Sequence, residues 1–204
     1  MGKNNAKMFN TQRGRPIPSS PLEALLRDSL SEEERAVLPR SWQIVGEVAL
    51  VHIHPLLQTK KTLIGESLLK LYPRCRTVME TKRIAGEYRE PVLEKIAGDG
   101  TETIDKENYV LYKLDVAKIM FSKGNFYERR RMGTVGTGEN VLDMFAGIGY
   151  FSLPMAVHAK PKKILAIELN PVSYGYLCEN IRLNHVEDIV EPVPGDCREK
   201  SPVG

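Results

Sequence analysis

The spacing of apolar residues near the start of the chain predicts a helix. Between residues 22 and 30 the leucines recur three and four positions apart, as on one face of a helix. Ser31 followed by Glu34 predicts a capped turn directly afterwards. Residues 1–21 are rich in Asn, Lys, Arg, Pro and Ser, which predicts a flexible tail. We therefore assign residues 1–40 to a flexible tail and an N-terminal helix.

The pattern over residues 41–132 predicts a small α+β unit followed by a linker. Two short strands are expected around Gly46, and an amphipathic helix over 62–71 that Pro73 ends. The remaining strand-like stretches of this unit are residues 76–80, 88–96, 101–104 and 110–115.

Residues 133–204 change to an alternation of buried strands and helices. Strands are predicted over 140–145, 163–168 and 189–196, with helices over 151–158 and from Pro171 onwards. The β-α-β-α-β order with short connections implies parallel strands and right-handed crossovers. The predicted fold is α/β, with a Rossmann-like domain over 133–204 preceded by the small α+β domain.

The predicted parallel sheet has few strands. A doubly wound sheet usually has about five to seven strands, and about 70 residues do not easily bury a parallel sheet on both faces. We therefore expect a chain that is truncated after the third strand, or a second chain that completes the sheet. For the 204 residues alone we expect little activity and marginal stability.

Composition excludes several classes of protein. Hydrophobic residues make up 42% and charged residues 27%, which is typical of a soluble globular protein. No apolar stretch is long enough to span a membrane. The three cysteines are widely spaced without a CxxC pair, which argues against a disulfide framework or a structural zinc site and favours a reducing, cytoplasmic setting.

The charge is distributed unevenly along the chain. The net charge is +3, but residues 1–132 hold 23 basic and 17 acidic residues, whereas 133–204 hold 6 and 9. This asymmetry favours an anionic partner held by the front half, although an unevenly charged solvated surface has the same composition.

A glycine-containing loop is the sharpest local feature. The segment from Asp143 to Gly149 (DMFAGIG) lies between a strand and a helix, where glycine lets the backbone approach a ligand and the helix start offers free N–H groups. Glu168 ends the next strand, 21 residues after Gly147, where an acidic residue accepts hydrogen bonds from ribose hydroxyls. Asp196 ends the third strand, within reach of an adenine amino group. A structural turn alone is the alternative for the glycine pair.

The nucleotide that fits this loop is S-adenosylmethionine. The NAD fingerprint has a third glycine where this chain has Ser152, and the chain has no GK[ST] phosphate-binding loop. A ligand with ribose and adenine but no pyrophosphate fits better. Asp143 is expected to orient the loop through backbone N–H groups, and Cys197 to be a neutral contact residue rather than a nucleophile.

Several motifs carry a resemblance to a known family. FAGIGYFSLP, AIELNP, ENIRLN and GDCRE resemble motifs of the class I methyltransferases that act on guanosine 37 of tRNA, and upstream segments match as well, so that residues 40–200 are covered. One branch is the tRNA guanine-37 N1-methyltransferases. The other transfers the 3-amino-3-carboxypropyl arm of S-adenosylmethionine to 4-demethylwyosine in wyosine biosynthesis. FSKGN, Tyr150 and Pro154 favour the second branch, in its archaeal type.

The resemblance implies a set of cofactor-binding residues. Ser122 and Arg129 would hold the methionine end of the cofactor, with the Arg129 guanidinium on its carboxylate. The alternatives are a helix cap for Ser122 and a solvated basic turn for Arg129. The whole implied set is Ser122, Arg129, Phe145, Gly147, Glu168, Asp196 and Cys197.

The resemblance also implies catalytic residues and a tRNA surface. In the methyltransferase branch an Arg and a Glu assist removal of the guanine proton, and Arg89 and Glu128 match them, with Glu128 as general base. A surface salt bridge is the alternative for both. Tyr88 and Tyr150 are candidates for stacking on bases of the anticodon loop, or for core packing. The residues expected to meet tRNA phosphates are Lys60, Lys61, Lys82, Arg83 and Arg89. No metal is expected, because the histidines lack convincing ligand spacing.

Overall fold

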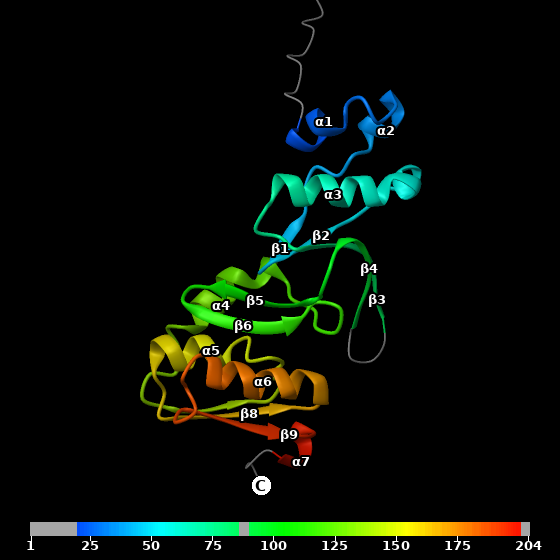
Figure 1. Ribbon diagram of the computed structural model, residues 1–204. Helices are drawn as coiled ribbons and strands as arrows, with labels where there is room; N and C mark the ends of the chain where they lie inside the picture. Colours follow the sequence, from blue (N-terminus) through cyan, green and yellow to red (C-terminus); the bar gives the residue numbers. More distant parts are fainter. Residues whose placement is uncertain (1–19, 86–89, 201–204) are drawn as a thin grey trace, which may run out of the picture.

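The computed structural model describes residues 20–85 and 90–200. It forms a stack in which the N-terminal helices lie at one end and a parallel sheet at the other (Figure 1). The tail predicted for residues 1–21 falls outside the described residues up to residue 19.

Both N-terminal helices begin at a serine cap, and the sequence predicted the second of the two. Helix α1 (Pro21–Leu26) starts at Ser20, whose side chain accepts a hydrogen bond from the Glu23 N–H. The predicted capping box between Ser31 and Glu34 is confirmed and opens helix α2 (Glu32–Ala36). The predicted amphipathic helix is confirmed as α3 (Lys61–Leu71), which follows the 3₁₀ turn η1 (Pro55–Lys60).

A four-stranded mixed sheet supports these helices. Its strands lie in the order β1 to β4, antiparallel except for the parallel pair β2 and β3. One face packs under α3, with a core that includes Ile64, Leu68 and Val78. The strands are β1 (Gln43–Val45), β2 (Val48–Val51), β3 (Thr77–Ala85) and β4 (Glu90–Gly98).

A β-hairpin connects this unit to the rest of the chain. Strands β5 (Glu102–Glu107) and β6 (Val110–Asp115) pair antiparallel around a two-residue turn. Tyr112 and Leu114 of β6 belong to the same core as Ile148 and Leu177 of the C-terminal part. The hairpin therefore shares a core with the C-terminal part, and this core continues to Val45, Val48 and Met79 of the four-stranded sheet.

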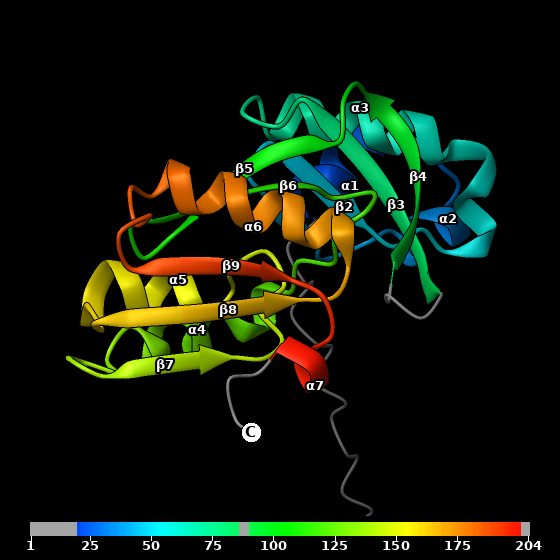
Figure 2. The same ribbon diagram turned by 90° about the horizontal axis from the view of Figure 1, so that it is seen from below.

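The C-terminal part confirms the predicted β-α-β-α-β order. Strands β7 (Asn140–Asp143), β8 (Lys163–Glu168) and β9 (Val190–Pro194) form a parallel sheet in that order. Figure 2 shows the three strands side by side, with α6 between the sheet and the hairpin. The helices of this part are α4 (Phe126–Met132, after the 3₁₀ turn η2, Lys123–Asn125), α5 (Ser152–Pro154), α6 (Pro171–Leu183) and α7 (Cys197–Lys200).

Two details of this part bear on the site. Asn170 caps α6, because its side chain accepts from the N–H groups of Val172 and Ser173. The helix expected over 151–158 is split into α5 and a π-helical turn, η3 (Met155–Ala159). Within the described ranges, none of the helices combines the length and apolar character needed to cross a membrane.

Candidate active site

The loop after β7 occupies the carboxyl edge of the parallel sheet. Gly147 and Gly149 have φ angles of +58° and +98°, in the left-handed region that favours glycine. A Cβ atom at Gly147 would lie 2.7 Å from the ring of Tyr150, so the loop also packs too tightly there for a side chain. The backbone of this loop is therefore held in one conformation beside the ends of β7 and β8.

Glu168 joins three elements at this edge. One carboxylate oxygen accepts from the Gly147 N–H and the other from the Asn170 N–H, both at 2.7 Å. The Glu168 carbonyl accepts from the Gly195 N–H after β9 at 3.0 Å. Because an ionised carboxylate has about four acceptor sites, Glu168 retains acceptor capacity for a ligand.

Asp143 orients the loop, as the sequence predicts. One of its carboxylate oxygens accepts from the Phe145 N–H at 3.3 Å. The other accepts from the Ser152 hydroxyl at 2.6 Å. Ser152 stands at the position of the third glycine of the dinucleotide fingerprint, and here it is fully buried and ties α5 to the end of β7.

Asp196 and Cys197 follow β9. Hydrogen bonds from the Arg198 side chain and backbone lower the pKa of Asp196 to about 2, so this carboxylate is ionised at neutral pH. The Arg198 side chain is 85% exposed, so a ligand has little packing to displace in order to reach Asp196. Cys197 is a half-buried free thiol.

An exposed apolar rim lies at the same edge. Phe145, two residues after the end of β7, is 78% exposed, and Leu169, directly after β8, is 54% exposed. Met144 is also exposed. Sequence reasoning singled out Phe145 but missed Met144 and Leu169, although apolar residues placed directly after buried strands were a usable signal.

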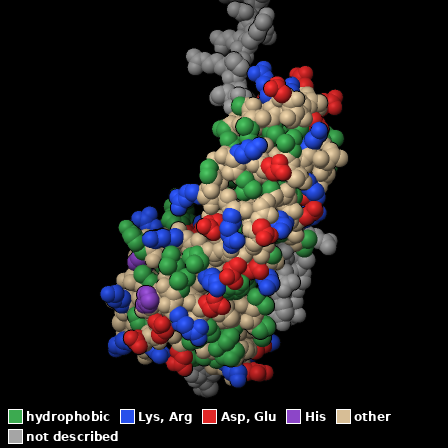
Figure 3. Space-filling view, in the orientation of Figure 1, with side chains coloured by type: hydrophobic (Ala, Val, Ile, Leu, Met, Phe, Trp, Pro, Cys, Tyr) green, Lys and Arg blue, Asp and Glu red, His purple; other side chains and the backbone are tan. Residues whose placement is uncertain are grey.

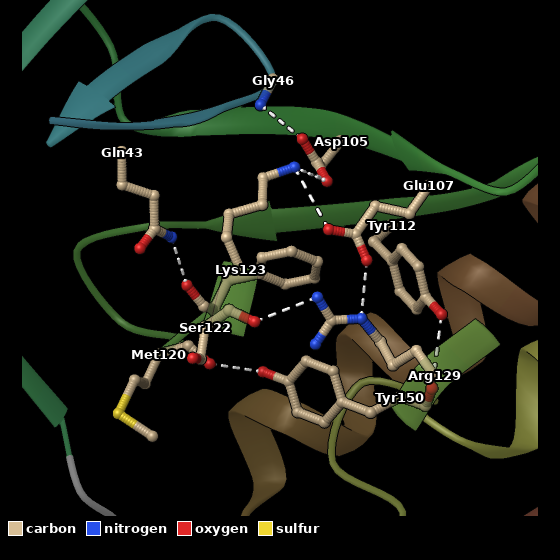
Figure 4. A network of polar contacts seen from close by, with 11 residues as sticks. Gln43, Gly46, Asp105, Glu107, Tyr112, Met120, Ser122, Lys123, Arg129 and Tyr150 are labelled. Atoms are coloured by element: carbon tan, nitrogen blue, oxygen red, sulfur yellow. Dashed lines mark hydrogen bonds and ion pairs between the residues drawn. The ribbon is translucent and has the colours of Figure 1, made fainter. Parts of the chain in front are cut away.

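Arg129 is buried on α4 (Figure 4). Its side chain is 4% exposed, and its Nε donates to the Glu107 carboxylate at 2.7 Å. One Nη donates to the Ser122 carbonyl at 3.0 Å, and the guanidinium stacks 4.6 Å from the ring centre of Phe121. Arg129 is thus no solvated turn residue. Two of its donors are already engaged, and its contact with a cofactor stays a prediction.

Ser122 precedes the turn η2 without capping it. Its side chain makes no capping hydrogen bond, so the helix-cap alternative is not what the structure has. Ser122 is half-buried, and its contact with the cofactor stays a prediction.

Sequence reasoning missed a buried ionic network around Arg129. The Lys123 ammonium lies 2.6 Å from Asp105 and 3.3 Å from Glu107. Asp105 also accepts from the Gly46 N–H at 2.8 Å, which links the network to the turn between β1 and β2. Thr103, Asp105 and Glu107 occupy the buried positions of β5, where a strand normally places apolar side chains. The sequence shows their alternation but not that this face is the buried one.

Tyr150 packs in the core rather than presenting its ring to solvent. Burial raises its pKa, and its hydroxyl donates to the Met120 carbonyl at 2.6 Å. The Tyr150 carbonyl would normally accept from the N–H of residue 154, but Pro154 has none. The Tyr112 hydroxyl donates to it instead, at 3.3 Å. Of the two alternatives for Tyr150, the structure favours packing, and Tyr88 lies outside the described residues.

The predicted catalytic pair is only partly described. Arg89 lies outside the described residues. Glu128 is exposed and forms two hydrogen bonds with Arg131, at 2.6 and 2.9 Å. This pairing lowers the pKa of Glu128, which makes its carboxylate a weaker base. The salt-bridge alternative therefore describes Glu128 as it stands, and its role as general base stays a prediction.

Two models of known protein families match this chain. Residues 103–204, half of the chain, match the family described as the TRM5/TYW2 methyltransferase domain. The chain belongs to the TRM5/TYW2 methyltransferase family. Residues 22–101 match the TYW2 N-terminal domain, so the boundary between the two matches falls at the start of the hairpin. The family and the fold expected from the motifs are thereby confirmed.

Individual relatives cover much of this TRM5/TYW2 chain. It is 44% identical over 162 residues to the tRNA(Phe) (4-demethylwyosine(37)-C(7)) aminocarboxypropyltransferase of Methanocaldococcus jannaschii. The alignment covers 78% of this chain and 61% of that relative. It is 40% identical over 174 residues to the tRNA (guanine(37)-N(1))-methyltransferase Trm5b of Pyrococcus abyssi, over 84% of this chain and 52% of the relative. The chain thus spans about three fifths of the length of the first of these relatives.

A solved structure supports the same grouping. The crystal structure of Pyrococcus horikoshii TYW2 in complex with MeSAdo has a TM-score of 0.76 and 40% identity. The alignment covers 87% of this chain and 64% of that one.

The lysines expected to face tRNA phosphates are partly neutralised in this TRM5/TYW2 chain. Lys61 lies 2.5 Å from Glu94, and Lys82 pairs with the same carboxylate. Lys60 is half-buried, and the side chains of Arg83 and Arg89 are not among those described. On the face shown in Figure 3 basic and acidic side chains are interspersed. The uneven charge along the sequence therefore does not form a patch of one sign on this face.

Two of the histidines, His52 and His54, have structural partners. His52 Nδ1 lies 3.3 Å from the Thr81 carbonyl, and the His54 ring accepts from the Leu56 N–H. In the part of the chain that the structure describes, no three His, Cys, Asp or Glu side chains are grouped so as to hold a metal ion.

Proposed function

We propose that this protein is an S-adenosylmethionine-dependent transferase that modifies position 37 of tRNA by adding the 3-amino-3-carboxypropyl group to 4-demethylwyosine. The observation that carries the proposal is the match of residues 22–101 to the TYW2 N-terminal domain. This match accompanies the methyltransferase domain and 44% identity to two named aminocarboxypropyltransferases. Because the chain covers about three fifths of those relatives, activity, substrate and tRNA partner are all part of the proposal.

The residues at the carboxyl edge of the sheet fit an adenosyl ligand. Glu168 would accept hydrogen bonds from the ribose hydroxyls with the acceptor sites that its two backbone partners leave free. Asp196 is ionised and would accept from the adenine amino group, beside Cys197. The exposed ring of Phe145 offers an apolar face for the base. Ser152 fills the place where a diphosphate-binding loop has glycine, which favours a ligand without diphosphate.

The remaining task of the protein is positioning. When bound, S-adenosylmethionine supplies alkyl carbons made electrophilic by a sulfonium, from which a neutral thioether leaves. Correct placement of the reacting atoms contributes up to about 7–11 kcal/mol to such reactions. The choice between methyl and aminocarboxypropyl products depends on which carbon lies in line with the target base. Residues that hold the amino-acid end, for which Ser122 and Arg129 are our candidates, therefore determine the product.

The proton of the target base must also be removed. In our proposal Glu128 accepts it, since its carboxylate is exposed on α4. Its lowered pKa limits it to a modest role, and the ion pair with Arg131 must open before it acts.

Transfer of label separates the candidate functions. The full chain is incubated with tRNA that carries 4-demethylwyosine and with S-adenosylmethionine labelled either at the carboxyl carbon or at the methyl group. Because these 204 residues alone are expected to have little activity, the amount transferred should be small, and it should be the carboxyl label and not the methyl label. Methyl label alone would instead support the methyltransferase alternative, which the 40% identity to Trm5b favours. Binding of the cofactor without transfer of either label would support a binding chain without turnover.

A further inference from the structure

Three successive backbone carbonyls of the linker before α4 each accept a hydrogen bond from a side chain in a different part of the chain (Figure 4). The Met120 carbonyl accepts from the Tyr150 hydroxyl at 2.6 Å. The Phe121 carbonyl accepts from the Gln43 amide at 2.6 Å. The Ser122 carbonyl accepts from Arg129 at 3.0 Å. We call residues 120–122 with these three donors the linker clamp.

The linker clamp fixes a segment that belongs to no helix or strand. Residues 116–122 lie between β6 and η2 without regular structure at the clamp. Since buried backbone carbonyls require partners, the three side chains determine where this segment lies. Phe121, at the centre, is only 5% exposed and contacts the guanidinium of Arg129.

The three donors are themselves fixed. Tyr150 belongs to the glycine loop, where its ring packs against Gly147. Arg129 is held by the buried carboxylate of Glu107. Gln43 lies on β1 of the N-terminal unit. The turn that follows β1 is attached to β5, because Gly46 N–H donates to Asp105.

The linker clamp therefore connects the N-terminal unit, through Gln43, with the glycine loop at the carboxyl edge of the parallel sheet, through Tyr150. Lys123, the residue after the clamp, pairs with the same Asp105 that holds the β1–β2 turn. One end of this path is the glycine loop, and the other is a strand in the sheet under α3.

We propose that Gln43 and Tyr150 are positioning residues for cofactor binding: through the linker clamp they hold Ser122 at the amino-acid end of the cofactor. The N-terminal unit then contributes to cofactor affinity without touching the cofactor. This inference rests on the proposed function, because it takes the carboxyl edge as the S-adenosylmethionine site.

Two probes distinguish local positioning from a general effect on the fold. S-adenosylhomocysteine has the amino-acid arm, whereas adenosine lacks it. Calorimetric titrations with both are made on the full wild-type chain, on Gln43→Leu and on Tyr150→Phe. Glu47→Gln is the matched control, because Glu47 lies at the same interface and its side chain pairs with exposed Arg76 outside the clamp.

We expect Gln43→Leu and Tyr150→Phe each to weaken S-adenosylhomocysteine binding about two- to tenfold, the value of one hydrogen bond. Adenosine affinity should stay unchanged in both variants, and Glu47→Gln should bind both probes as the wild type does. Tyr150→Phe keeps the ring and removes only the hydroxyl, so it tests the inference even if Gln43→Leu does not fold.

Two results would overturn the inference while leaving the proposed function intact. One is an unchanged affinity for S-adenosylhomocysteine in both variants. The other is an equal loss for both probes, which a merely structural role would produce. Failure of the wild-type chain to bind either probe would reject the proposed function, and this inference with it.

Discussion

Among single residues, Glu107 and Arg129 form the most deeply buried ion pair of the described chain. Their side chains are 5% and 4% exposed. One Glu107 oxygen bonds Arg129, and the other makes no hydrogen bond but faces the Lys123 ammonium at 3.3 Å. Removal of one partner from a buried pair leaves the other charge uncompensated, which costs far more than loss of an exposed pair.

Glu107→Gln should therefore lower the free energy of unfolding by about 3–5 kcal/mol, measured by urea denaturation. Glu191→Gln removes an exposed pair with Lys163 and should cost less than about 1 kcal/mol. Equal effects of the two substitutions would show that the buried pair does not constrain the fold.

The sequence predicted some residue contacts and not others. Asp143 and Glu168 were expected at one edge, because the carboxyl ends of parallel strands meet there, and both contact the glycine loop. The partner of Arg129 was not predictable, because Glu107 lies 22 residues earlier, beyond the strand expected over 101–104. Which side of α4 faces inward is decided by packing, and no local pattern in a row of three arginines reveals it.

Among the elements, α6 completes an edge of the hairpin. Asn180 Oδ1 accepts from the Lys113 N–H at 2.7 Å, and its Nδ2 donates to the Lys113 carbonyl at 3.1 Å. Asn184, one helical turn later, makes the same two contacts with Leu111. The two amides thus pair with β6 as a neighbouring strand would.

Asn180→Ala should lower the free energy of unfolding by about 1–3 kcal/mol, because it leaves buried backbone groups of β6 unpaired. The backbone amide of Lys113 should also exchange its hydrogen faster. Arg182→Ala, an exposed position on the same helix, is the control and should change neither quantity. Unchanged exchange at Lys113 in Asn180→Ala would contradict the pairing.

A second element contact is sensitive to pH. Glu94 on β4 binds both Lys61 of α3 and Lys82 of β3, and these hydrogen bonds lower its pKa from 4.5 to about 2. A depressed folded-state pKa stabilises the fold above the unfolded-state value, and this contribution is lost as pH falls through the folded-state value. The melting-temperature difference between wild type and Glu94→Gln should thus be full above about pH 5 and vanish below about pH 2. A difference that is independent of pH would contradict it.

Helices with strong end signals were predictable, and strand lengths were less so. The capping box at Ser31 and the helix start at Pro171 are local signals, and both are confirmed. The extent of β3 and β4, which have nine residues each, depends on their pairing with each other, which local patterns do not encode. The helix expected over 151–158 is irregular because Pro154 cannot donate a backbone hydrogen bond.

At the scale of the whole molecule, the N-terminal unit is joined to the hairpin by the close packing of the β1–β2 turn against β5. Gly46, in the β1–β2 turn, has φ +54°, and its N–H donates to Asp105. A Cβ atom there would meet the Thr103 hydroxyl and lie 2.6 Å from the Ile104 carbonyl oxygen. Gly138 has a similar φ of +70° with nothing within 4 Å of a built Cβ.

These two glycines separate backbone strain from the steric contact between the units. Gly138→Ala should cost about 1–2 kcal/mol, from the left-handed backbone alone. Gly46→Ala should cost about 1–3 kcal/mol more, because the methyl group is forced against the hairpin. The free energy of unfolding of both variants is the measurement. Equal costs would mean that the turn does not press on β5.

The parallel direction of β7, β8 and β9 could be predicted from the sequence. The sheet or core against which the hairpin packs could not. The alternation of Val110, Tyr112 and Leu114 predicts a half-buried strand whichever sheet it packs against. The structure packs it with the C-terminal core, and the family match starts there as well, at residue 103. The alternating pattern alone does not show that the hairpin shares a core with the parallel sheet.

The account depends on S-adenosylmethionine binding at the carboxyl edge of β7, β8 and β9. The most direct test is equilibrium titration of the cofactor into the full chain and into Glu168→Gln, with Glu191→Gln as the control on the same sheet. We predict one site in the wild type and in the control. Affinity in Glu168→Gln should be at least about tenfold weaker, the value of a charge-assisted hydrogen bond. Absence of binding by the wild type, or equal affinity in Glu168→Gln, would contradict the account.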